Sequence, residues 1–334
     1  MVSAAPDAAA PVPVIDVGAL TGAGGDPREA ARAIGHACRT HGFFQIVNHG
    51  VDAALERRLF ACAREFFAWP DARKAEIAMA RGGRAWRGWF PLGAELTSGR
   101  PDWKQGVYFG AELDASHPRV RAGTPLHGAN LFPAIPGFRD TVRAWIDAMT
   151  ALGHALLRGI ALSLALPADW FARYTADPTV LFRIFEYPEI PRDAAEPAWS
   201  VGEHTDYGVL TILLQDDAGG LEVKAGGRWT PAPPIPGAFV CNIGDMLDRM
   251  TGGLYRSTPH RVRNTASRSR LSFPFFFDPS WDAVVQPIPG CAPAHDDAGQ
   301  RWDRASVHAW TGTYGEYLLA KVSKVFPELG REVL

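Results

Sequence analysis

The sequence predicts a mainly β fold with flanking α helices. Glycine and proline turns separate short strand-like runs in the second half of the chain, at residues 180–187, 209–214, 221–223, 238–243 and 271–277. Several short strands with turn signals between them are typical of β sandwiches and barrels. The first half instead carries apolar side chains at helical spacing, which predicts helices packed against the β core.

Composition narrows the class of protein. A chain of 334 residues, 47% hydrophobic and 21% charged, can bury a large core. A net charge of -2 without long charge runs gives no electrostatic case for binding nucleic acid or an anionic membrane. The four cysteines form no C-x-x-C pair, which favours reduced thiols in a cytoplasmic protein. No apolar run reaches the length of a membrane span.

The first half of the chain shows helical spacing between short extended runs. Residues 1–12, rich in Ala and Pro, predict a disordered tail rather than a signal peptide. A short strand is expected at residues 12–17, before a glycine-rich loop and a helix. Extended residues 43–47 precede a second helix that starts near Asp52. Residues 138–166 predict a long amphipathic helix that backs the sheet.

Residues 81–104 are less regular and combine aromatic, glycine and charged residues. Loop regions of this kind often present binding side chains on a rigid scaffold. Glu95 and Thr97 could meet a cationic group, such as an amine or a guanidinium, in a substrate. The alternative is that the region covers one end of the barrel, and the two roles are compatible.

His204, Asp206 and His260 are the candidate metal ligands. In an extended backbone His204 and Asp206 point to the same face, so their side chains can bind one ion. Two imidazoles and one carboxylate, with positions left open, are typical of non-haem Fe(II) sites that activate oxygen. A structural zinc site prefers four ligands, usually thiolates, and no cysteine lies near these residues in the sequence.

Arg270 and Ser272 form a second candidate element, on one face of an apolar strand-like run. The guanidinium and the hydroxyl can bind a carboxylate together. Arg261, Arg263 and Arg268 are also nearby, but only Arg270 has a hydroxyl two residues further on in an apolar strand. An unpaired charge would be costly there, which favours Arg270 as the carboxylate anchor.

With these residues the chain resembles the iron(II)- and 2-oxoglutarate-dependent oxygenases of the isopenicillin N synthase-like superfamily. The resemblance extends from about residue 13 to residue 289. Its motifs are residues 13–16, residues 41–50, His204-x-Asp206, residues 242–245, residues 257–262 and Arg270-x-Ser272. It implies a double-stranded β-helix, a jelly-roll barrel. It also implies Fe(II) and 2-oxoglutarate, with the distal carboxylate of 2-oxoglutarate at Arg270 and Ser272.

The resemblance assigns roles to further residues. Tyr187 would add a hydroxyl to the same carboxylate, and Arg183 would face the co-substrate or the substrate. An ion pair of Arg183 with Glu186 or Glu189 is the alternative. A turn role is expected for residues 244–245. The candidates for the substrate wall are Phe90, Glu95, Thr97, Tyr207, Phe275 and Phe277.

The implied function is an Fe(II)/2-oxoglutarate dioxygenase. It would use O2 to oxidise, most simply to hydroxylate, a C–H bond of a small molecule and release succinate and CO2. Glu-x-Thr segments in relatives that hydroxylate arginine-like amino acids, and in ethylene-forming relatives, suggest an amino acid; a specialised metabolite is the other substrate class. An iron oxidase that does not use 2-oxoglutarate, and a non-catalytic metal-binding jelly roll, stay open as alternatives.

The expected organisation is one integrated domain. A mixed helical region, residues 13–177, would pack on the catalytic barrel of residues 178–290, and a helical extension would follow at residues 291–334. A small-molecule substrate is the expected partner, without nucleic acid or membrane. The sequence predicts no oligomeric state.

Overall fold

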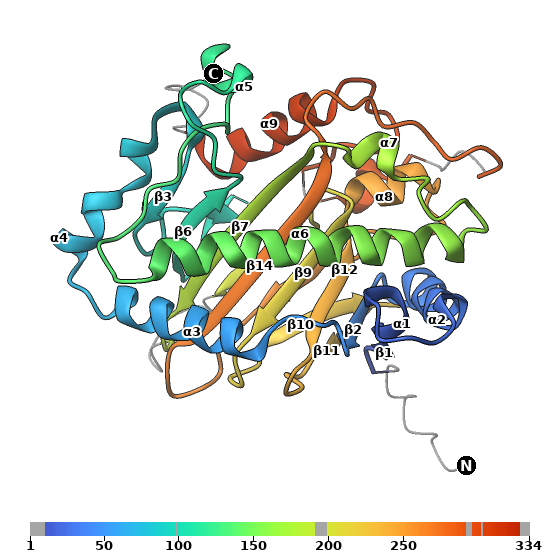
Figure 1. The fold of residues 1–334 in the computed structure, drawn as a ribbon, viewed down its shortest axis with the longest axis horizontal. Coiled ribbons are helices and arrows are strands. Elements are labelled where there is room, and N and C mark those ends of the chain that lie inside the picture. Colours follow the sequence, from blue (N-terminus) through green and yellow to red (C-terminus); the bar gives the residue numbers. More distant parts are fainter. Residues whose placement is uncertain (1–10, 98, 191–198, 292–295, 302, 328–334) are drawn as a thin grey trace.

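Two β-sheets face each other at the centre of the protein, and helices cover the larger sheet (Figure 1). The computed structural model describes residues 11–97, 99–190, 199–291, 296–301 and 303–327. Most of the predicted tail, residues 1–12, therefore lies outside the described residues. Val12, its last residue, is buried in the hydrophobic core.

Antiparallel pairing builds both sheets, except for the parallel edge pair of β1 and β2. The larger sheet has the order β1 (Val14–Asp16), β2 (Phe43–Val47), β12 (Phe239–Ile243), β9 (Leu210–Gln215), β14 (Arg270–Ser280), β7 (Pro178–Tyr187), β6 (Gln105–Gly110) and β3 (Gly88–Phe90). The smaller sheet has the order β11 (Arg228–Pro231), β10 (Leu221–Ala225), β13 (His260–Val262) and β8 (Val201–His204). This arrangement confirms the predicted mainly β fold and its double-stranded β-helix.

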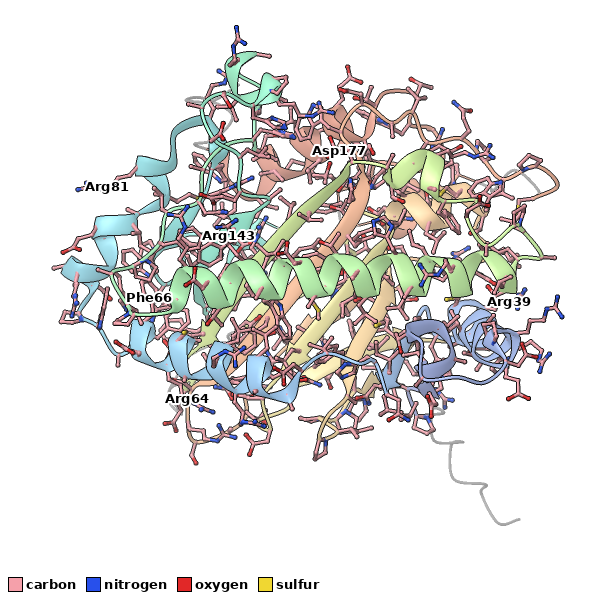
Figure 2. The ribbon with its side chains drawn as sticks, in the orientation of Figure 1. Arg39, Arg64, Phe66, Arg81, Arg143 and Asp177 are labelled. Atoms are coloured by element: carbon pink, nitrogen blue, oxygen red, sulfur yellow. The ribbon has the colours of Figure 1, made fainter. Side chains whose placement is uncertain are left out.

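The long helix α6 (Phe138–Ser163) crosses the outer face of the larger sheet, and α3 (Ala53–Phe67) runs beside it (Figure 1). Gly153 permits this close approach, because a Cβ there would lie 2.7 Å from the ring of Phe277 on β14. Figure 2 shows Arg64 on the side of α3 away from α6, whereas Phe66 is buried and contacts Phe138 of α6. One face of the sheet thus becomes helix-covered core, and the other face is left to form the site.

The remaining helices are shorter. They are α1 (Gly18–Thr21), α2 (Pro27–Thr40), α4 (Asp71–Lys74), η1 (Ala75–Ile77), η2 (Met79–Ala85), α5 (Pro118–Arg121), α7 (Ala172–Thr175), α8 (Asp245–Met250), η3 (Ala298–Gln300) and α9 (Tyr314–Val325). The sequence sets several of their starts. Asp26 caps α2 ahead of a proline at its first position, and Thr313 with Glu316 forms a capping box on α9.

Residues 81–104, expected as an irregular region, include a small hairpin of β4 (Leu96–Thr97) and β5 (Arg100–Pro101). The hairpin places Glu95 and Thr97 in buried positions facing the cavity between the larger and the smaller sheet. Among the described helices, none is both long and apolar enough to cross a membrane.

Candidate active site

Strand pairing brings the candidate metal ligands together. His204 ends β8 and His260 begins β13, and the two residues lie opposite each other in the antiparallel pair. Asp206 lies two residues beyond His204, just outside β8. Its Oδ1 lies 3.8 Å from His204 Nε2 and 3.7 Å from His260 Nε2, and all the candidate ligand atoms lie within 4.8 Å of one another.

Main-chain carbonyls orient both imidazoles. His204 Nδ1 lies 2.8 Å from the Gly202 carbonyl oxygen, and His260 Nδ1 lies 3.3 Å from that of Thr258. Contacts of this kind fix the ring and leave Nε2 for a metal. Burial lowers the pKa of both histidines, so they are neutral and able to donate a lone pair at pH 7.

The Asp206 carboxylate is also held for metal binding. Its Oδ2 accepts hydrogen bonds from Thr211 Oγ1 at 2.5 Å and Asn242 Nδ2 at 2.7 Å, which leaves Oδ1 facing the imidazoles. Burial disfavours the charge, but His260, His204 and these hydrogen bonds outweigh it and lower the pKa of Asp206. Two neutral imidazoles and one ionised carboxylate fit the donor set expected for Fe(II). No local sequence signal pointed to the role of Thr211.

Arg270 begins β14 and is fully buried. Its Nη2 donates to Gln215 Oε1 at 3.0 Å, but Nε and Nη1 have no hydrogen-bond partner among the described residues. Tyr187 lies opposite on β7, with its ring centre 4.9 Å from the guanidinium carbon. Burial raises the pKa of the Tyr187 phenol, while Arg270 and a hydrogen bond with Ser272 oppose that rise. A buried guanidinium with unpaired donors is stabilised when it binds an anion. Arg270, Tyr187 and Ser272 together offer donors that match a carboxylate.

A cavity of about 140 Å³ lies between the two sheets and is lined by the candidate metal ligands and by two neighbours of Arg270. Its wall includes the three candidate metal ligands together with Ser272 and Tyr187. The remaining wall is mostly apolar, with a few buried charged groups. The cavity therefore has space for a small molecule next to the metal ligands, with Ser272 and Tyr187 in its wall.

The comparisons with known proteins agree with this geometry. Residues 12–135 match the family described as the non-haem dioxygenase in morphine synthesis N-terminal region, and residues 174–279 match the 2OG-Fe(II) oxygenase superfamily. A probable iron/ascorbate oxidoreductase of Dictyostelium discoideum is 48% identical, over 97% of each chain. The protein belongs to the Fe(II)/2-oxoglutarate oxygenases.

Other relatives of this oxygenase carry more specific names. A 1-aminocyclopropane-1-carboxylate oxidase of Dictyostelium discoideum is 37% identical, over 95% of each chain. Homoarginine-6-hydroxylase of Arabidopsis thaliana is 34% identical, over 94% of this chain and 97% of its own. A solved full-length protein of Neurospora crassa in complex with alpha-KG has a TM-score of 0.78 at 28% identity, over 93% of this chain and 96% of that chain. The chain is therefore an Fe(II)/2-oxoglutarate dioxygenase, not a non-catalytic jelly roll.

When bound, Fe(II) with 2-oxoglutarate and O2 supplies the oxidation of an unactivated C–H bond, and 2-oxoglutarate leaves as succinate and CO2. His204, Asp206 and His260 would hold the iron of this oxygenase. Arg270, Ser272 and Tyr187 would hold the distal carboxylate of 2-oxoglutarate. Apolar side chains make up much of the cavity wall around them, which disfavours water next to the reacting groups.

Glu95 and Thr97 line the cavity of the oxygenase and belong to a buried cluster of charged side chains. Lys104 Nζ lies 3.0 Å from Glu95 Oε2 and 2.8 Å from Asp102 Oδ2, and Thr97 donates to Asp102 at 2.6 Å. Burial disfavours the Lys104 charge, but Asp102 and Glu95 overcome this and raise its pKa. One lysine thus faces two carboxylates. Sequence reasoning did not find the Asp102 partner, because this pairing depends on the β4–β5 hairpin.

Arg183 lies on the cavity face of β7, with its guanidinium carbon 3.5 Å from the centre of the Tyr108 ring. It donates to the main-chain carbonyls of Phe109 and Phe182, each at 3.2 Å. The alternative ion pair with Glu186 or Glu189 is not formed. Glu186 lies on the opposite face of β7 from Arg183 and accepts a hydrogen bond from Gln105 instead.

The structure corrects part of the expected substrate wall. Phe275 and Phe277 do not reach the cavity, since they lie on the other face of β14; Phe277 contacts Gly153 and the ring of His154 on α6. Phe276, between them, faces the cavity instead. Phe90 does not line the cavity either, because it packs behind the wall against Tyr108, Phe185 and Phe326. Tyr207 does line it, as expected.

Asp278 is a buried acid in the cavity wall that sequence reasoning did not single out. Tyr314 of α9 donates to its Oδ2 at 2.5 Å, while its Oδ1 has no hydrogen-bond partner among the described residues. Burial raises the pKa of Asp278 from 3.8 to about 8, although the bond from Tyr314 opposes the rise. Because side chains alternate along a strand, residue 278 is expected on the same face of β14 as Arg270 and Ser272.

Asp278→Asn is expected to flatten the pH dependence of stability. The folded protein keeps the Asp278 proton up to about pH 8, whereas the unfolded chain releases it near pH 4. Wild-type stability therefore falls across this interval relative to the variant, by about 2 kcal/mol between pH 6 and pH 8. Urea unfolding of metal-free protein at both pH values measures the difference. If the free energy of unfolding changed equally with pH in the wild type and the variant, Asp278 would not be the group that holds a proton in the folded protein.

Proposed function

We propose that this oxygenase hydroxylates a C–H bond of a free amino acid whose side chain ends in a cationic group. The observation that carries the proposal is that the Glu95 carboxylate shares its nearest cation with a second buried carboxylate. Glu95 and Asp102 share the single ammonium of Lys104, and Glu95 Oε2 receives no well-directed hydrogen bond despite its 3.0 Å distance from Lys104. A substrate amine or guanidinium would give Glu95 a cation that it does not share with Asp102.

Arg183 is the proposed partner of the substrate's carboxylate. It is buried, and no carboxylate among the described residues forms an ion pair with it. The substrate carboxylate would pair with this guanidinium, while the cationic end would reach Glu95. The Tyr108 phenol interacts with both Glu95 and Arg183, so the two sites belong to one wall. The relative named homoarginine-6-hydroxylase is consistent with a substrate that has these two charged ends.

The test is a comparison of charged substrates with neutral substrates of the same shape. Purified protein with Fe(II), 2-oxoglutarate and O2 would be given L-arginine, L-homoarginine, L-citrulline and L-homocitrulline. We expect a product heavier by one oxygen atom, formed together with succinate, from a guanidino substrate and not from its ureido counterpart. Equal turnover of both kinds would contradict recognition by charge. Oxidation without succinate would favour the iron oxidase alternative.

Glu95→Gln is expected to remove the preference for a cationic substrate. Loss of a buried charge partner should raise KM for the guanidino substrate by about 30-fold or more. The ureido counterpart should bind at least as well as before, because it needs no negative charge. Steady-state kinetics with both substrates measure this change. Glu203→Gln is the matched control, because that carboxylate is exposed on β8 and pairs with Lys224.

A further inference from the structure

The loop that carries the ligand Asp206 is held by the start of α8. Asp245 N–H donates to the Asp206 carbonyl at 2.8 Å, and Met246 N–H donates to the Gly208 carbonyl at 2.9 Å. Gly244 makes this contact possible, because a Cβ there would lie 2.4 Å from the Gly208 oxygen and 3.0 Å from the Asp206 oxygen. The backbone of the metal-binding loop therefore follows the position of α8.

The first residue of α8, Asp245, has a larger role than the expected turn. Its side chain is fully buried, forms an ion pair with Arg301, and accepts a 2.8 Å hydrogen bond from the Tyr317 hydroxyl of α9. Arg301 and Tyr317 both come from the C-terminal part of the chain. A turn residue would need neither partner, so the turn expectation is corrected.

Arg301 joins several parts of this network. Its Nη2 lies 3.3 Å from Asp248 Oδ2, its Nε lies 2.6 Å from Asp297 Oδ2, and its Nη1 lies 3.4 Å from Thr205 Oγ1. The side chain is only 6% exposed. Thr205 lies between His204 and Asp206 in the sequence, so Arg301 contacts the metal-binding loop directly and also through Asp245.

We propose that Arg301 is a positioning residue for the metal site, which fixes the loop between His204 and Gly208 through Thr205 and Asp245. It does not touch the ligand atoms. Without it, the buried carboxylates of Asp245 and Asp248 would lose their shared cation beside the loop, and the start of α8 would shift to reach water. The Asp206 backbone would move with it. The C-terminal extension is thus part of the metal site and not only a cover over the barrel.

Metal affinity separates this proposal from a purely structural role. Co(II) is the probe, because it is stable in air and its visible bands report ligand geometry. Arg301→Gln is expected to weaken Co(II) binding about tenfold, the lower end of the range for direct partners of metal ligands, because Arg301 acts on the ligand through the loop backbone. The band positions should change as the loop moves. Arg301→Lys should restore part of the affinity by keeping the charge. The test needs no substrate, so it is independent of the proposed amino acid reaction.

Lys321→Met is the matched control. Lys321 forms a buried 2.6 Å ion pair with Asp303 in the same C-terminal extension. Within the described part of the chain it forms no ion pair or hydrogen bond with Arg301, Asp245 or Thr205, and it approaches the Arg301 network only at the ring of Tyr317, whose centre lies 5.2 Å from its Nζ. Both variants should lower Tm, but Lys321→Met should keep Co(II) affinity within about twofold. Equal effects of the two variants on Co(II) binding would overturn the proposal. If Arg301→Gln does not fold, Tyr317→Phe is the test, because it removes only the hydroxyl bound to Asp245. Weaker Co(II) binding by this variant would support the proposal, and unchanged binding would overturn it.

Discussion

Arg270→Met is expected to weaken 2-oxoglutarate binding by about 100-fold while leaving Fe(II) affinity unchanged. Removing one partner of a buried charged hydrogen-bond pair costs about 2–5 kcal/mol, and Arg270 offers two otherwise unpaired donors to the ligand. Methionine keeps much of the side-chain volume. The measurement is an anaerobic titration of the iron-loaded protein with 2-oxoglutarate, followed by the weak visible charge-transfer band of the chelate.

Two comparisons make this result specific. Arg268→Met is the control, because the Arg268 side chain is 49% exposed, forms an ion pair with Asp217 and does not line the cavity. In addition, the metal-free Arg270→Met protein should unfold at the wild-type temperature or above, since a buried charge without a carboxylate partner is replaced by an apolar group. Unchanged 2-oxoglutarate affinity in a folded Arg270→Met protein would reject Arg270 as the anchor.

Side-chain alternation explains how far the sequence could predict the site. Because side chains of an extended chain alternate between two faces, the sequence predicted that His204 shares a face with Asp206, and Arg270 with Ser272. In the structure His204, Asp206 and Ser272 line one cavity, and Arg270 is buried without lining it. The same rule should have assigned the aromatic wall. Residues 270, 272, 274, 276 and 278 share a face, so the sequence already contained the reason why Phe276 lines the cavity, and not Phe275 or Phe277.

The features missed by sequence reasoning are contacts between distant residues. Asp245 and Arg301 lie 56 positions apart and meet only after the C-terminal extension has packed on the barrel. The pairing of Lys104 with Glu95 and Asp102 depends on the β4–β5 hairpin, whose short strands give a weak signal. Buried polar partners of this kind follow from tertiary packing. Local periodicity can therefore predict which face a residue occupies, but not which residue it meets.

Asp206→Ala is expected to abolish metal binding and turnover together. Asp206 is the negatively charged member of the candidate ligand set. The Oδ1 atom of Asp206 lies within 3.8 Å of both imidazole Nε2 atoms. Two neutral histidines remain in the variant. They offer an incomplete, uncharged ligand set, so Co(II) and Fe(II) affinity should fall by at least about 100-fold, the upper range seen even for outer partners of metal ligands.

Asp206→Asn sharpens this test, because it preserves the size of the side chain and can keep a hydrogen bond from Thr211 or Asn242 to its amide oxygen. If charge and a free carboxylate oxygen are what the metal needs, the Asn variant should fold like the wild type and still bind Co(II) much more weakly. Glu203→Gln removes an exposed carboxylate three residues away and should bind Co(II) normally. Retention of wild-type Co(II) affinity by a folded Asp206→Asn protein would mean that the metal does not bind at this carboxylate, and the iron site would then have to be placed elsewhere.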